Sequence, residues 1–110
     1  MVEDTLKRIE REIIGNDNLS QEKKQQLTGL LTELKEQILN LNNTNTIDAA
    51  SIANYAETSI REATRQEKSS ELLSHSIEGL SLYAKKFEVS HPTLIGVINT
   101  IGQTLVNIGV

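Results

Sequence analysis

The sequence has no cysteine and no tryptophan, and it contains a single proline. Without cysteine the chain can form neither a disulfide framework nor a cysteine-ligated zinc site, and a reducing cytoplasmic location is expected. The only aromatic residues are Tyr55, Tyr83 and Phe87. A core must therefore be built from Leu, Ile, Val and Ala, which favours helices packed on helices over a sheet of aromatic and β-branched strands.

Basic residues are also scarce, with 11 Lys and Arg against 15 Asp and Glu and a formal net charge of −4. Such a chain has no positive field to attract phosphate groups, so no nucleic-acid partner is expected. The charged N-terminal segment cannot serve as the apolar core of a signal peptide. A length of 110 residues predicts one helical domain over 1–110. A domain this small can need a second copy to bury its apolar side chains, so we expect a homo-oligomer and favour a dimer.

The first part of the chain predicts a helical hairpin over residues 2–41. Apolar residues recur there at helical spacing in two stripes: Val2, Leu6, Ile9 and Ile13, then Leu27, Leu30 or Leu31, Leu34, Ile38 and Leu41. The second stripe is close to the heptad spacing of coiled coils. Gly15 and the polar residues after it predict the turn, and Ser20 is suited to cap the second helix. A polar connector over 42–47 follows.

Residues 48–89 contain no proline, and Gly79 is their only glycine. Their apolar stripes are Ala49, Ile52, Ala53, Ala56, Ile60 and Ala63, then Leu73, Ile77, Leu80, Ala84 and Phe87. Between the stripes, Thr64 to Glu71 has no apolar residue. The segment is either one long helix or two helices joined near Ser69 and Ser70, where a serine could cap the second. A break is favoured because helices of about 40 residues are rare outside coiled coils.

No Asp, Glu, Lys or Arg follows Glu88. Pro92 suits a first helical turn and predicts a helix over 92–108. Its stripe consists of Leu94, Ile98, Ile101, Leu105 and Ile108. Gly109 is suited to end this helix, with Val110 folding back onto Leu105. The segment is too polar to span a membrane and lacks the basic face of an interfacial helix, so no membrane partner is expected. The sequence thus predicts an all-α antiparallel bundle of four to five helices, with the C-terminal helix as its most buried element.

The C-terminal stretch "FEVSHPTLIGVINTIGQTLVNIGV" resembles the end of a small bacterial all-helical family known only as a domain of unknown function (number 4404). The shared pattern is Phe-Glu-x-x-His-Pro-Thr-Leu followed by Asn-x-Gly-Ile or a close variant. It corresponds here to Phe87, Glu88, His91, Pro92, Thr93, Leu94, Asn107, Gly109 and Val110. The resemblance covers about 2–40 and 72–110 and is weakest over 41–71. It implies a compact helical domain without an assigned activity.

Two groups of residues could bind a small ligand or a metal ion. Glu88 and His91 place a carboxylate and an imidazole at a helix start, although holding the bend explains both. Glu71, His75 and Glu78 lie on one helical face, yet a metal site in a bundle also needs carboxylates from facing helices, whose stripes are aliphatic. We expect neither group to hold a cofactor or metal.

The basic residues of the third segment alternate with acids and predict a solvated face: Arg61, Arg65, Lys68, Lys85 and Lys86 among Glu57, Glu62, Glu67 and Glu71. No combination of residues suggests catalysis. The best interpretation is a non-enzymatic structural or protein-interaction module that self-associates and could also bind an unidentified protein. The expected interface residues are Ala53, Ala56 and Ile60 together with Ile98, Ile101, Leu105 and Ile108.

Overall fold

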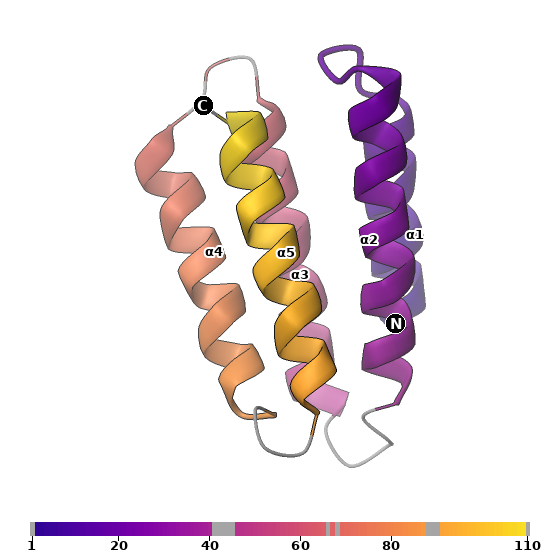
Figure 1. Ribbon diagram of the computed structural model, residues 1–110, viewed down its shortest axis with the longest axis vertical. Helices are drawn as coiled ribbons and strands as arrows, with labels where there is room; N and C mark the ends of the chain where they lie inside the picture. Colours follow the sequence, from indigo (N-terminus) through magenta and orange to yellow (C-terminus); the bar gives the residue numbers. More distant parts are fainter. Residues whose placement is uncertain (1, 41–45, 66, 68, 88–90, 110) are drawn as a thin grey trace.

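The computed structural model contains five α-helices, and it describes residues 2–40, 46–65, 67, 69–87 and 91–109. The helices are α1 (Val2–Ile14), α2 (Gln21–Leu39), α3 (Thr46–Thr64), α4 (Ser70–Lys85) and α5 (Pro92–Gly109). Helices consecutive in the sequence run in opposite directions (Figure 1). The expected all-α antiparallel bundle is therefore confirmed.

The helices α3 and α5 lie at the centre of the bundle. Helix α3 contacts α1, α4 and α5, while α5 contacts α2, α3 and α4. The α1–α2 hairpin covers one side of this central pair, and α4 forms the opposite edge of the molecule (Figure 1). The C-terminal helix is buried on its apolar stripe as expected, but α3 shares the central position with it.

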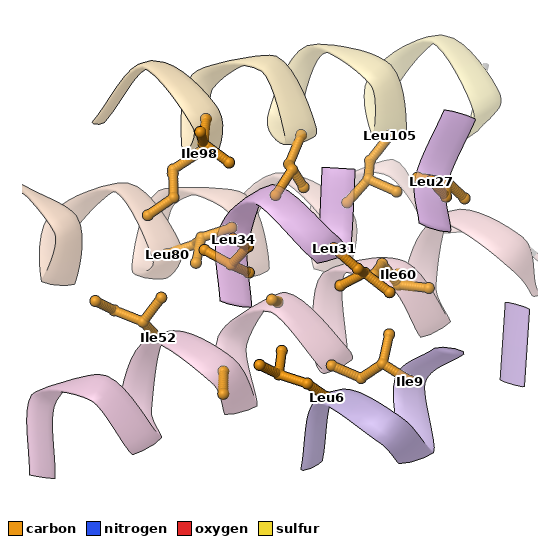
Figure 2. Close-up of a cluster of buried hydrophobic side chains, with 14 of the residues drawn as sticks. Leu6, Ile9, Leu27, Leu31, Leu34, Ile52, Ile60, Leu80, Ile98 and Leu105 are labelled. Atoms are coloured by element: carbon orange, nitrogen blue, oxygen red, sulfur yellow. The ribbon is translucent and has the colours of Figure 1, made fainter. Parts of the chain in front are cut away.

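The core is a single cluster of apolar side chains, all aliphatic except Phe87, to which all five helices contribute. Figure 2 shows Leu6 and Ile9 of α1, Leu31 and Leu34 of α2, Ile52 and Ile60 of α3, Leu80 of α4, and Ile98 and Leu105 of α5 pointing toward one another. Every predicted stripe contributes buried residues to the core. Among the described side chains of all the stripes, only three remain partly exposed: Leu30, Ile77 and Ile108. The side chain of Val2 and all of Leu41 lie outside the described residues.

Serine hydroxyls cap two of the helices, as the sequence predicts. Ser20 Oγ accepts a hydrogen bond from the Lys23 amide at 3.2 Å, and Ser69 Oγ accepts one from the Leu72 amide at 3.3 Å. Each hydroxyl thereby satisfies one of the amide donors that a helix start leaves unpaired. The cap at Ser69 separates α3 from α4, so the segment from 48 to 89 forms two helices rather than one.

The remaining boundaries are close to those expected. Helix α3 begins at Thr46, within the predicted polar connector, and α5 begins at Pro92. Between α1 and α2, Asn16 Oδ1 accepts a hydrogen bond from the Asn18 amide at 2.8 Å, which closes the turn. Helix α5 extends to Gly109, one residue beyond its predicted end, and Val110 lies outside the described residues.

The backbone of α4 packs directly against a tyrosine of α3 at Gly79. A Cβ atom added at Gly79 would overlap the ring of Tyr55. That ring is held by a second tyrosine, since the centroids of Tyr55 and Tyr83 are 5.3 Å apart. Gly79 therefore leaves room for the tyrosine that packs between the two helices.

This approach predicts opposite effects of one substitution at two helical glycines. Gly79→Ala should lower the free energy of unfolding by about 1–3 kcal/mol, because the new methyl group displaces the Tyr55 ring. Gly29→Ala on α2, where no heavy atom lies within 4 Å of the added carbon, should raise it by about 0.5–1 kcal/mol through helix propensity. Urea unfolding followed by circular dichroism measures both, and equal changes would contradict the close contact at Gly79.

Candidate functional site

The residues of the C-terminal motif form the corner that leads into α5. The Phe87 ring is buried and meets the His91 ring edge-on, with centroids 6.2 Å apart. The His91 amide donates to the Phe87 carbonyl at 2.7 Å, and the His91 carbonyl accepts from the Leu94 amide at 3.1 Å. These contacts give Phe87, His91 and Leu94 a structural role. Glu88, which was predicted to hold this bend together with His91, lies outside the described residues.

The second candidate group lies on the outer surface of α4. Glu71, His75 and Glu78 are exposed and border a shallow hollow of about 190 Å³ together with Ser70 and Ser74. All of these residues belong to one helix, so no facing helix completes a coordination shell. Across the described ranges, no group of three or more His, Cys, Asp or Glu side chains is placed to hold a metal ion.

The residues expected to contact a second copy lie in or against the core of the single chain. Ala53, Ala56, Ile60, Ile98, Ile101 and Leu105 are each at most 2% exposed, and Ile108 is half-buried. These six residues are not accessible to a second copy, because neighbouring helices of the same chain cover them, whereas Ile108 stays partly accessible. Any self-association must use a different surface.

The densest charged cluster in the described chain joins α1 to α3. Arg8 Nε and Nη2 donate to the two carboxylate oxygens of Glu57 at 2.6 and 2.9 Å. Arg61 Nη2 donates to Glu57 Oε2 at 3.4 Å and to Glu12 Oε1 at 2.8 Å. Two residues of each helix therefore form one network, which includes a bidentate arginine–carboxylate pair, the strongest geometry for such a contact.

Glu57 is the buried centre of this network, with only 6% of its surface exposed. The hydrogen bonds from Arg8 lower the pKa of its carboxyl below the usual range, and the charge of Arg61 adds to this effect. Burial alone would raise that pKa, so the two guanidinium groups outweigh the cost of removing the carboxylate from water. Glu57 is therefore ionised in the folded protein at neutral pH.

The sequence interpretation placed Glu57 on a solvated face, and this is wrong. Arg61, Arg65, Lys85 and Lys86 are exposed as predicted, and Lys68 lies outside the described residues. The sequence does indicate that Glu57 is buried, because it follows Ala53 by four residues and precedes Ile60 by three. That spacing puts its carboxylate on the buried stripe of α3.

A cleft of about 440 Å³ lies next to the network, between the C-terminal parts of α1 and α3. It is lined by Glu12, Ile13, Asn16, Ile60, Arg61, Glu62, Thr64 and Arg65. Its charges largely neutralise one another: Arg65 Nη1 pairs with Glu62 at 3.0 Å, and Arg61 pairs with Glu12. Glu12 Oε2 is buried and has no protein donor among the described residues. Among the residues that line the cleft, no nucleophile and base are in contact.

The protein is an all-α bundle, and the charged network around Glu57 joins two of its helices, α1 and α3. The sequence profile of the family described as "Domain of unknown function (DUF4404)" matches residues 27–110. The chain belongs to this family. The match differs in extent from the expected resemblance: it includes 41–71 and begins within α2, leaving α1 outside.

The other comparisons add no further relative. Searches among curated proteins and among solved structures find no match. No helix in the described part of the chain is both long and apolar enough to cross a membrane.

The network predicts a stability effect that depends on pH. Glu57→Gln, which keeps the shape but removes the charge, should lower the free energy of unfolding at pH 7 by about 1–3 kcal/mol. Because the folded pKa of Glu57 is lowered, the charged carboxylate stabilises the fold above the ordinary Glu pKa of about 4.3. That contribution is lost as the pH falls through the folded value.

The difference between wild type and Glu57→Gln should therefore shrink on acidification, as measured by urea unfolding at pH 7 and pH 3. Glu10→Gln, an equivalent change at an exposed position of α1, is the matched control and should have an effect below about 0.5 kcal/mol. A Glu57→Gln effect of the same size at both pH values would show that the charge does not stabilise α1 on α3.

Proposed function

We propose that this chain is a non-enzymatic protein-interaction module that self-associates as a dimer in the cytoplasm. One observation carries the proposal: the neighbouring helices α4 and α5 have exposed apolar side chains, and α5 contains no Asp, Glu, Lys or Arg. Among the described residues, half of the exposed large hydrophobic side chains lie on these two helices, namely Leu72, Leu82 and Val106.

The exposed residues of α5 are unusual for a water-facing helix. Between Pro92 and Ile108 they are Pro92, Thr93, Gly96, Asn99, Thr100, Gln103, Val106 and Asn107. None of them is charged, although 24% of the whole chain consists of Asp, Glu, Lys and Arg. Depletion of charged residues is typical of the buried centre of protein interfaces. Gly96 adds open space on this helix, because no heavy atom lies within 4 Å of a Cβ added there.

The chemistry of the cleft between α1 and α3 supports the non-enzymatic part of the proposal. Its arginines are engaged by carboxylates of the same cleft, at 2.8 Å for Arg61 and Glu12 and at 3.0 Å for Arg65 and Glu62. Such pairing stabilises helix packing and leaves these groups little capacity for proton transfer. A cytoplasmic setting agrees with the absence of cysteine.

The proposal predicts a dimer in solution. Size-exclusion chromatography with light scattering should give a mass near twice the chain mass of 12.2 kDa at high micromolar concentration. Dilution should shift the protein toward the monomer, because the exposed apolar area is small and implies modest affinity. A monomeric mass across the whole concentration range would contradict the proposed self-association.

A further inference from the structure

We propose that α4 is the helix through which two copies pair, in antiparallel orientation, about a two-fold axis that passes near Ser81 and Leu82. The inference rests on the proposed self-association and specifies its contact. Helix α4 is suited to this role because it forms an edge of the bundle, with its outer face directed away from the other helices (Figure 1).

The outer face of α4 has an apolar centre. Leu82 is 64% exposed, which makes it the most exposed large hydrophobic residue described on α4 or α5. It borders a hollow of about 360 Å³ lined by Ile77, Glu78, Ser81, Leu82 and Lys85. Ile77 is half-buried: its side chain packs against the core and also lines this hollow. A leucine from a second copy would find apolar contact there.

Two opposite charges flank this centre. Glu78 and Lys85 are seven residues apart, which is about two helical turns, so they lie on the same face of α4. Both are exposed, and neither forms an ion pair within the described part of the chain. The neighbouring Lys86, by contrast, is already paired, because its Nζ atom lies 3.1 Å from Asp48 Oδ1. Glu78 and Lys85 are thus available to a partner.

This arrangement is complementary to itself only when the two helices are antiparallel. In a two-fold interface, if Glu78 of one copy meets Lys85 of the other, then Lys85 of the first must meet Glu78 of the second. The two leucines then lie between two equivalent ion pairs. A parallel arrangement would instead place Glu78 against Glu78 and Lys85 against Lys85. The two charges are therefore self-complementary in an antiparallel pair, which is the reason for assigning a second copy as the occupant.

Charge exchange tests this geometry. Glu78→Lys and Lys85→Glu each turn both intermolecular ion pairs into like-charge contacts, so each should raise the dimer dissociation constant about tenfold. The double variant Glu78→Lys/Lys85→Glu restores opposite charges at both contacts and should dimerise like the wild type. An equimolar mixture of the two single variants should form heterodimers. Sedimentation equilibrium at several concentrations measures all four samples beside the wild type.

The outcomes separate this inference from the broader proposal. A wild-type dimer whose dissociation constant is unchanged by either single substitution would overturn the pairing through α4 while leaving self-association intact. A double variant as weak as the single variants would overturn the antiparallel arrangement. A monomeric wild type would overturn both proposals.

A second pair of variants tests the apolar centre. Leu82→Glu should raise the dissociation constant by at least about tenfold, because a carboxylate would be buried between the copies. Leu39→Glu is the matched control, since Leu39 on α2 is similarly exposed at 56%. Both positions face solvent in the single chain, so both variants should retain wild-type helicity by circular dichroism. Equal dissociation constants for the two variants would contradict the proposed contact at Leu82.

Discussion

The packing of three helices around α3, whose buried stripe is rich in alanine, determines how the rest of the bundle is arranged. Ala53, Ala56 and Ala63 are completely buried there, and their short side chains allow neighbouring helices to approach closely. Helices α1, α4 and α5 all contact α3. With larger residues at these positions, the helices would be pushed apart and the aliphatic core around them would lose contacts.

The same face of α3 contains the one buried carboxylate in the described core, and this residue helps to position α1. Leu6, Ile9 and Ile13 supply the apolar contacts of α1, but apolar packing alone tolerates sliding along a helix. The bidentate contact between Arg8 and Glu57 is directional, so it favours one register of α1 on α3. Removing only one partner would leave the other charge poorly compensated. We therefore regard the network as a determinant of how the hairpin docks.

Much of the fold could be predicted from the sequence, because helical periodicity identifies which residues are buried. Ser69 and Pro92 mark where helices begin, since a hydroxyl cap and a restricted backbone act locally. The contact between Arg8 and Glu57 could not be predicted in this way, because it joins residues 49 positions apart. Periodicity also cannot distinguish burial within a chain from burial between chains. For that reason Ile98 and Leu105 were expected at an interface, whereas they complete the core.

The contact between Tyr55 and Tyr83 has a spectroscopic consequence. The chain has no tryptophan and only these two tyrosines, and both lie where α3 meets α4. Intrinsic fluorescence therefore reports on this one contact, whereas circular dichroism reports on all the helices. If the α1–α2 hairpin separates from the bundle before the rest unfolds, the two signals will change at different denaturant concentrations. Coincident transitions would instead identify the five helices as one cooperative unit.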